Sequence, residues 1–341
     1  MLQQQPEEET SPRGRPETVS YTRASYLPSA GIVFDPHLRR HNPGPGHPEQ
    51  PARISAVLDH LRFSGTFDVL ERIAPRPASD DELALAHGRK YIDLARREVL
   101  AGYQELSTGD TYVSEDSFDC ASRAAGCVIA AVDAVFDRTA SSAFCLIRPP
   151  GHHAESNRGM GFCLFNNIAV GARYAQQRYG VERVLIADWD VHHGNGTQQI
   201  FYEDSSVFFF STHQSPWYPG TGSADETGAG PGEGSTQNCP LPAGSGREQV
   251  FKAFREVLLP KAEAFHADLV MISAGFDSRI GDPLGLFTLE DSDFAELTEL
   301  MLEVAGASTA GGLISVLEGG YNLTGLASAA DAHISVLAGR R

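Results

Sequence analysis

The chain has 341 residues, a formal net charge of −17 and 41% hydrophobic residues. This composition is typical of a folded protein rather than a disordered one. The acidic balance argues against a protein that mainly binds nucleic acid, because little positive charge is available to neutralise phosphates. It does not exclude a cationic substrate. No apolar run is long enough to cross a bilayer, so no membrane partner is expected.

The N-terminal stretch differs from the rest of the chain. Residues 1–29 lack the apolar core of a signal peptide, and their glutamates argue against a transit peptide. We expect a disordered or loosely docked extension, followed by one catalytic domain over residues 30–341. The five cysteines form no Cys-x-x-Cys pair, so we expect reduced, structural cysteines in a cytoplasmic protein rather than a thiolate zinc site.

After residue 30, short apolar segments alternate with amphipathic ones. Segments that are apolar on both faces are typical of a parallel sheet, and their alternation with helices predicts βαβ units. One segment, residues 212–246, is rich in Gly and Pro, and we expect a long functional loop there that carries Trp217 and Tyr218. The predicted strands are 31–34, 142–147, 183–187, 207–211, 268–273 and 313–317, and the predicted helices are 50–61, 120–136, 168–179, 247–265 and 289–304.

Clusters of polar and ionisable residues follow five of the predicted strands. In an open parallel sheet, ligands bind beyond the carboxyl ends of the strands. The clusters should therefore converge on one rim of the sheet. They are RPPGHH at 148–153, DWDVHHGNG at 188–196, STH at 211–213, AGFD at 274–277 and EGGY at 318–321.

Three of these residues have the spacing and chemistry of metal ligands. Asp190 and His192 are two residues apart at a strand end, so both side chains can reach one metal, and Asp277 supplies a third ligand. Two carboxylates and one imidazole leave open positions for catalysis, with Zn²⁺ as the first choice and Fe²⁺, Mn²⁺ or Co²⁺ as alternatives. Asp190 and His192 could instead cap a helix or pair with each other, but the clustering of ionisable residues favours the metal.

The adjacent His152 and His153 sit on a turn, where both can face one pocket. Asp188 and Asn195 flank the metal ligands and are their available partners. A carboxylate keeps an imidazole charged or strongly oriented, whereas an amide only orients it, so the two histidines should differ in role. His193 and His213 are more readily explained as structural histidines.

Tyr321 follows two glycines that let the backbone turn and place the phenol toward the metal. There it could donate a hydrogen bond to a carbonyl oxygen as negative charge develops. The sequence contains no nucleophile elbow, P-loop or dinucleotide fingerprint. A metal, a proton-accepting histidine and an oxyanion-stabilising tyrosine together predict metal-assisted hydrolysis of an amide.

Six ordered motifs give the sequence a family resemblance. RPPGHH, GFCLFNN, DWDVHHGNGTQ, PGTG, SAGFDSRIGDPLG and LEGGY resemble the arginase/deacetylase superfamily, most closely class II histone deacetylases and their bacterial relatives, including acetylpolyamine amidohydrolases. The resemblance runs from about residue 31 to the C-terminus. It implies a single-domain α/β fold with about eight parallel strands and helices on both faces. It also implies a zinc-dependent deacetylase that acts on N-epsilon-acetyl-lysine.

The resemblance further implies roles for individual residues. His153 would be the general base and acid, His152 its electrostatic partner and Tyr321 the group that polarises the carbonyl. Asp188 matches the partner of His152, and Asn195 matches the class II pattern, where class I members carry Asp. The implied sites are Zn²⁺ at Asp190, His192 and Asp277, structural K⁺ at Asp188, Asp190, His192 and Ser211, and a substrate tunnel at Gly161, Phe162 and Tyr218 with Asp110 at its rim.

Two features favour an acetylated peptide or protein over a small acetylated amine. Polyamine-selective relatives carry Glu after Gly-Asp-Pro, but Leu284 stands here and cannot attract a distant ammonium. No insertion of the kind that narrows the entrance of bacterial polyamine enzymes is evident between residues 37 and 51. A third candidate is an arginase-like ureohydrolase, but the sequence lacks the motifs of that class of enzyme. The intact set of catalytic residues argues against a fourth candidate, a non-catalytic binding protein. The protein target and the oligomeric state stay open.

Overall fold

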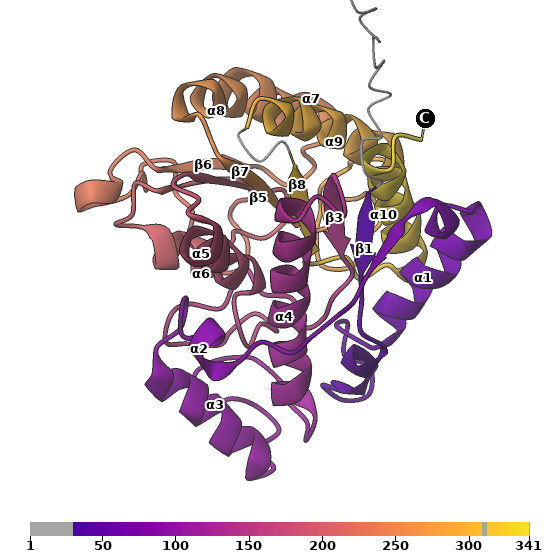
Figure 1. The fold of residues 1–341 in the computed structure, drawn as a ribbon, viewed down its shortest axis with the longest axis vertical. Coiled ribbons are helices and arrows are strands. Elements are labelled where there is room, and N and C mark those ends of the chain that lie inside the picture. The colour runs from indigo at the N-terminus through magenta and orange to yellow at the C-terminus, as the bar shows by residue number, and fades with distance from the viewer. Residues whose placement is uncertain (1–29, 309–311, 341) are drawn as a thin grey trace, which may run out of the picture.

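The computed structural model describes residues 30–308 and 312–340, so the expected extension at 1–29 lies outside the described residues (Figure 1). Its centre is one eight-stranded sheet in the order β2-β1-β3-β8-β7-β4-β5-β6. Every neighbouring pair of strands is parallel, as the sequence predicts. The strands are β1 (Gly31–Val33), β2 (Glu71–Ile73), β3 (Ser142–Cys145), β4 (Val184–Asp188), β5 (Val207–Gln214), β6 (Thr236–Leu241), β7 (Leu269–Ala274) and β8 (Leu313–Leu317).

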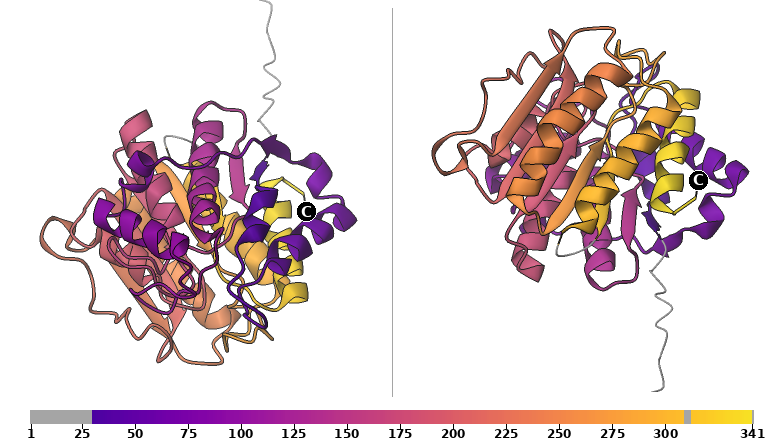
Figure 2. Two further views of the ribbon diagram at one scale, coloured as in Figure 1. Left: turned by 90° about the horizontal axis from the view of Figure 1, so that it is seen from below. Right: turned by 90° about the horizontal axis from the view of Figure 1, so that it is seen from above.

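Helices cover both faces of this sheet (Figure 2). On one face, α4 (Ser117–Phe136) packs against β1, β3 and β8, and α5 (Asn167–Tyr179) packs against α4 and β7. On the other face, α9 (Asp291–Gly306) and α10 (Leu323–Leu337) pack against the sheet and each other. The remaining α-helices of the described chain are α1 (Ala52–Ser64), α2 (Asp80–Leu83), α3 (Arg89–Leu100), α6 (Asn195–Phe201), α7 (Arg247–Lys252) and α8 (Leu259–Phe265), with a π-helical stretch (Ala253–Leu258) joining the last two.

The six predicted strands are present, but the expectation of a loop over residues 212–246 is wrong at both ends. β5 continues to Gln214, and β6 pairs with it in parallel as the edge strand. β6 reads TQNCPL, which is polar and contains Pro240, so it lacks the continuous apolar run of a central strand. Proline and polar residues are tolerated at a sheet edge, where one side needs no ladder partner. The other edge strand, β2, is only three residues long and was missed for the same reason.

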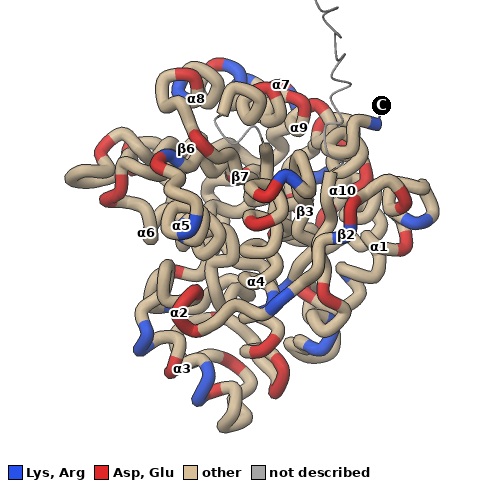
Figure 3. The backbone as a smooth tube through the Cα atoms, in the orientation of Figure 1, with Lys and Arg blue, Asp and Glu red and all other residues tan. Residues whose placement is uncertain are grey.

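Charged residues lie on the helices and loops around this sheet, with Asp and Glu outnumbering Lys and Arg (Figure 3). Most of the interior is apolar, with Trp189, Phe144 and Phe210 among the largest buried side chains, but Arg53 and Arg148 are fully buried as well. None of the described helices combines the length and the hydropathy that a membrane crossing requires. The five cysteines are all free, as expected.

The long helix α4 approaches its neighbours through small residues. A Cβ atom added to Gly126 would lie 2.0 Å from the carbonyl oxygen of Arg76 and 2.5 Å from the amide nitrogen of Ala78. These are backbone atoms, which cannot rotate away as a side chain would. Gly126 is therefore needed for the segment that leads into α2 to lie against α4.

We predict that Gly126→Ala lowers the free energy of unfolding by about 1–3 kcal/mol, the usual cost of overpacking. The higher helix propensity of alanine, worth ~1 kcal/mol, offsets only part of this loss. Gly306→Ala in α9 is the matched control, because a Cβ atom there meets nothing within 4 Å. Urea unfolding followed by circular dichroism measures both variants. Equal stability changes at the two positions would contradict the packing argument.

Candidate active site

The polar clusters that follow the central strands meet at the carboxyl edge of the sheet. β3, β8, β7 and β4 are consecutive in the sheet, so the loops that follow them are neighbours. His152 and His153 follow β3, Asp190 and His192 follow β4, and Tyr321 follows β8. Asp277 follows β7. The structure therefore brings together the residues that the sequence places on one rim.

Asp190, His192 and Asp277 form a compact buried cluster, in which one ligand atom from each residue lies within 4.8 Å of the others. Nδ1 of His192 lies 3.0 Å from Oδ1 of Asp190 and 3.2 Å from Oδ2 of Asp277. Within the described part of the chain, this Oδ2 atom is buried without accepting a hydrogen bond. Ligands about 2.0–2.2 Å from one Zn²⁺ ion have similar mutual spacing. The cluster therefore fits a divalent metal ion.

Backbone amides occupy other carboxylate oxygens of this cluster. Gly319 donates to Oδ2 of Asp190 at 2.8 Å, and Val191 donates to Oδ1 of Asp277 at 2.9 Å. These bonds hold the carboxylates so that Oδ2 of Asp277 faces the cluster. A Cβ atom at Gly319 would lie 2.0 Å from that oxygen, and one at Gly275 would lie 2.1 Å from Oδ2 of Asp190. Both glycines are needed because the backbone passes so close to the ligands.

The two buried carboxylates of the cluster need a nearby positive charge. Burial, together with the neighbouring Asp190, raises the pKa of Asp277 to about 7. Burial opposes the charge on His192, but the adjacent carboxylates of Asp190 and Asp277 together outweigh burial and raise its pKa to about 10. A proton on His192 thus compensates the carboxylates in the absence of a cation. Metal binding would displace this proton, which makes metal affinity dependent on pH.

His152 and His153 lie side by side, with ring centroids 4.0 Å apart, but have different partners. Nδ1 of His152 lies 3.0 Å from Oδ2 of Asp188, and Nδ1 of His153 lies 2.8 Å from Oδ1 of Asn195. Burial opposes the charge on His152, but Asp188 and then Asp190 raise its pKa to about 10. Burial and the charge of His152 hold the pKa of His153 well below its ordinary value. One imidazole is therefore charged and the other neutral.

Tyr321 lies in a loop that is held from two sides. Arg53 donates to the carbonyl oxygens of Gly320 and Glu318, and its guanidinium carbon lies 5.0 Å from the centroid of the Tyr321 ring. Opposite, Oδ2 of Asp282 accepts hydrogen bonds from the backbone amides of Tyr321 at 2.7 Å and Asn322 at 3.0 Å. These contacts fix the position of the phenol.

Arg53 is fully buried and depends on a second buried network. Oε1 of Glu49 accepts from Arg53 at 3.2 Å, and the same carboxylate forms two hydrogen bonds with Arg148, at 2.9 and 2.6 Å. Sequence reasoning missed Glu49 and Arg53, which look like ordinary charged residues at the start of a helix. Only their partners, one of them 267 positions away, reveal their role.

A narrow cavity of about 280 Å³ leads to this cluster. Gly161 takes a positive φ of 57° and passes so close that a Cβ atom would lie 2.3 Å from the His153 ring. Asp110 accepts from the Gly161 amide at 2.7 Å and from the Tyr218 hydroxyl at 3.3 Å. The structure thus places the predicted tunnel residues around one opening. The cavity is lined by Asp110, His153, Gly161, Phe162, His192, Trp217, Tyr218, Pro283, Leu284 and Tyr321.

Ser211 and His193 do not line this cavity. Ser211 is the register partner of Asp188, and its hydroxyl lies 2.9 Å from Nδ1 of His213. A potassium ion at Asp188, Asp190, His192 and Ser211 stays a prediction. His193 makes hydrogen bonds with the side chains of Thr221 and Gln198, which fits a structural histidine.

Comparisons with known proteins agree with this geometry. Residues 47–337 match the family described as "Histone deacetylase domain". The crystal structure of the HD domain of HDA15 superimposes with a TM-score of 0.87 at 38% identity, covering 92% of this chain and 89% of that one.

Curated relatives share about the same level of identity. "Histone deacetylase 6" of Caenorhabditis elegans is 41% identical over 86% of this chain and 32% of its own length. A "Probable deacetylase" of Archaeoglobus fulgidus is 40% identical over 86% of this chain and 82% of its own length. "Polyamine deacetylase HDAC10" of Homo sapiens is 40% identical over 85% and 44%. The chain thus spans about a third of the worm protein and most of the archaeal one. It belongs to the histone deacetylase family and resembles its class II members.

Proposed function

We propose that this protein is a zinc-dependent deacetylase that removes acetyl groups from N-epsilon-acetyl-lysine in peptides or proteins. The observation that carries the proposal is the grouping of three kinds of functional side chain next to the cavity. There the cluster of Asp190, His192 and Asp277 lies beside the neutral imidazole of His153 and the phenol of Tyr321. Two carboxylates and one imidazole favour Zn²⁺ while leaving positions open for substrate. A bound metal would polarise the acetyl carbonyl and lower the pKa of the attacking water.

His153 is positioned to take the proton of that water. Because Oδ1 of Asn195 can only accept, the facing Nδ1 atom of His153 carries a hydrogen, and Nε2 is left with a lone pair. Burial and the neighbouring His152 charge keep the pKa of His153 low, so this lone pair is free in the resting protein. After the attack, the protonated Nε2 would donate to the leaving amine, which completes the transfer.

Tyr321 is positioned to stabilise the negative charge that develops on the carbonyl oxygen. Burial raises the pKa of its phenol well above the ordinary value despite the opposing effect of Arg53, and the carboxylates of Asp277 and Asp190 act in the same direction as burial. The phenol therefore keeps its proton and donates a hydrogen bond. A preorganised donor of this kind contributes more in a buried site than in water.

An acetylated polyamine is the second candidate substrate, because relatives from three vertebrates carry the name "Polyamine deacetylase HDAC10". Leu284 argues for the peptide. It lines the cavity, and its carbonyl oxygen accepts from the indole of the exposed Trp217 at 2.9 Å. An apolar side chain at this point offers no attraction to a second ammonium group.

The deacetylase proposal is tested by comparing two neighbouring histidines. His153→Ala should lower kcat on an acetyl-lysine peptide by about 10²–10⁴-fold, which is the contribution of a general base. His193→Ala removes a buried imidazole whose partners are Thr221 and Gln198, so its effect on kcat should be much smaller. Both variants are compared after circular dichroism and metal analysis show folded, zinc-loaded protein. Equal losses would contradict the role of His153.

Asp277→Asn should lower the zinc content of the protein, but it should make the stability of the chelated protein less sensitive to rising pH. The amide is a poorer ligand than the carboxylate, so zinc content should fall from about one ion per chain toward zero. In the chelated wild type, burial and Asp190 hold the folded pKa of Asp277 at about 7, above its ordinary value. The folded wild type then binds a proton that the unfolded chain does not, so its free energy of unfolding falls as pH rises from about 4 to about 7. Asp277→Asn lacks this titrating group, so its free energy of unfolding should fall less over the same range.

Plasma emission spectrometry measures the zinc content, and urea unfolding at pH 5 and pH 8 measures the stability of the chelated proteins. Zinc-loaded wild type is the control and should be more stable than its chelated form. Full zinc content in Asp277→Asn would contradict the ligand assignment. An unchanged pH dependence in the variant would contradict the electrostatic argument.

The substrate is tested by kcat/KM for an acetyl-lysine peptide and for N8-acetylspermidine. Wild type should prefer the peptide, and Leu284→Glu should raise kcat/KM for the polyamine by about 10–100-fold, as expected for one charge-assisted contact. Leu284→Gln is the matched control, because it has similar size without charge. A wild-type preference for the polyamine, or equal gains in both variants, would overturn the interpretation of Leu284.

A further inference from the structure

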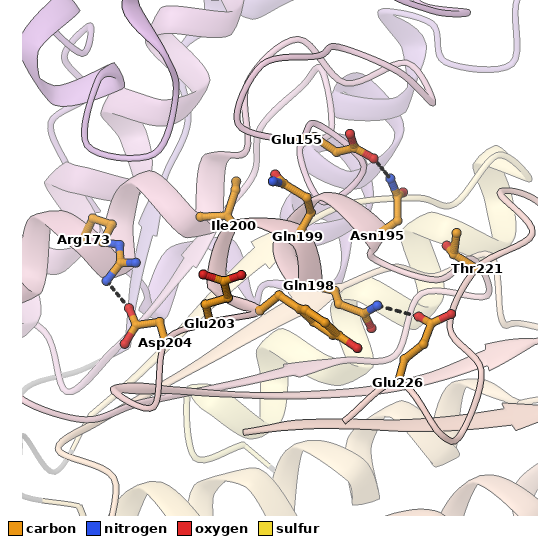
Figure 4. Close-up of a pocket in the computed structure, with 11 residues that line it drawn as sticks. Glu155, Arg173, Asn195, Gln198, Gln199, Ile200, Glu203, Asp204, Thr221 and Glu226 are labelled. Carbon is orange, nitrogen blue, oxygen red and sulfur yellow. Dashed lines mark hydrogen bonds and ion pairs between the residues drawn. The ribbon is translucent and has the colours of Figure 1, made fainter. Parts of the chain in front are cut away.

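A second cavity lies next to Asn195, the hydrogen-bond partner of His153. Its volume is about 700 Å³, and it opens to solvent. Asn195 belongs to both regions, because it contacts His153 on one side and lines this cavity on the other. Figure 4 shows its amide beside the carboxylate of Glu155, with Glu203 further along the same cavity.

The Asn195 amide joins Glu155 to His153. Oδ1 of Asn195 lies 2.8 Å from Nδ1 of His153, and Nδ2 donates to Oε1 of Glu155 at 3.0 Å (Figure 4). The other neighbours of Nδ2 are the carbonyl oxygen of His153 at 3.4 Å and the sulfur of Met160 at 3.3 Å. The carbonyl oxygen is a weaker acceptor because it is farther away, and the sulfur is weaker because a thioether accepts poorly. Glu155 is thus the strongest acceptor that Nδ2 has.

The direction of this amide decides which nitrogen of His153 carries a hydrogen. A carboxylate can only accept, so Glu155 attracts the NH₂ end of Asn195 and repels the oxygen end. The oxygen therefore faces His153 and requires a hydrogen on its Nδ1 atom. If the amide turned by half a rotation, its NH₂ group would face Nδ1, and the hydrogen would move to Nε2. That tautomer has no lone pair at the atom that must accept a proton.

We propose that Glu155 is a positioning residue for the catalytic base, because it fixes the direction of the Asn195 amide and thereby the tautomer of His153. This inference rests on the proposed role of His153. It assigns the two neighbouring histidines different kinds of partner. The Asp188 carboxylate touches His152 directly and favours its charged form. The Glu155 carboxylate acts through a neutral amide, so it orients His153 without a direct ion pair.

The backbone at Glu155 is held independently of its side chain. Its amide donates to the carbonyl oxygen of Arg158 at 2.9 Å, and its own carbonyl oxygen lies 3.0 Å from Nδ1 of His87. Variants of the side chain should therefore leave the loop in place. This permits a direct test in the full-length, zinc-loaded protein.

Glu155→Ala should lower kcat for an acetyl-lysine peptide by about tenfold or more, within the contribution of a general base, while KM changes by less than about twofold. Glu155→Gln should recover part of kcat, because its amide oxygen can still accept from Asn195. Glu203→Gln is the matched control, since it removes a charge from the same cavity and should leave kcat unchanged. Equal losses in Glu155→Gln and Glu203→Gln would overturn the proposal in favour of a general charge effect.

In a double-mutant cycle with Asn195→Asp, we predict that the effect of Glu155→Gln on kcat is lost or changes sign. An aspartate has two equivalent oxygens and needs no orientation, and it would lie about 3 Å from the Glu155 carboxylate, as the amide nitrogen does. Glu155→Gln should therefore leave kcat unchanged or raise it in the Asn195→Asp background, although it lowers kcat in the wild-type background. Equal losses in the two backgrounds would show that Glu155 does not act through the Asn195 amide.

Nitrogen NMR of ¹⁵N-histidine-labelled, zinc-loaded protein reads the tautomer without turnover, with the signals of His153 assigned from their loss in His153→Ala. Wild type and Glu203→Gln should show hydrogen on Nδ1, and Glu155→Ala should show a population with hydrogen on Nε2. An unchanged tautomer in Glu155→Ala would overturn the proposal. If wild type had no deacetylase activity, the proposed function would fail, but the NMR result would still decide the role of Glu155.

Discussion

A concentration of buried carboxylates at the carboxyl edge of the sheet is the constraint on which the site depends. Asp188, Asp190, Asp277 and Glu318 are all fully buried there. Buried charge is costly unless it is paired and hydrogen-bonded, so each carboxylate needs a partner. Glu318 accepts from the backbone amides of Gly151 at 2.6 Å and of His152 next to it. Asp188 has an imidazolium, and Asp190 and Asp277 share an imidazole and a position suited to a cation.

The same constraint separates the two histidines. Part of the positive charge drawn to this edge lies on His152, whose Nδ1 atom is 3.0 Å from Asp188. A second charge on the adjacent His153 would then be opposed by burial and by repulsion, so it stays neutral. An amide partner suits a neutral imidazole because it adds no further negative charge. The pairing of a charged His152 with a neutral His153 therefore follows from the positions of the carboxylates at the ends of the strands.

Much of this could be predicted from the sequence, and the exceptions have a common cause. The central strands, the metal cluster, the histidine pair and Tyr321 are encoded locally, by apolar runs and by short motifs directly after them. The edge strands β2 and β6 were missed because an edge strand needs no apolar run. Arg53 and Glu155 were missed because a charged residue shows its function only through its partner. Arg53 binds a carbonyl 267 residues away, and Glu155 acts on a residue 40 positions along the chain.

One carboxylate holds two segments that line the cavity. Asp282 accepts from the backbone amide of Leu284 at 3.0 Å through one oxygen, and from the amides of Tyr321 and Asn322 through the other. Leu284, which lines the cavity, and the loop that carries the phenol are therefore anchored to the same group. Under the proposed function, this anchor would couple selectivity to turnover. An evolutionary change of substrate that moved the backbone at Leu284 would also disturb Tyr321, so new specificities should arise most readily by side-chain exchange that leaves this anchor in place.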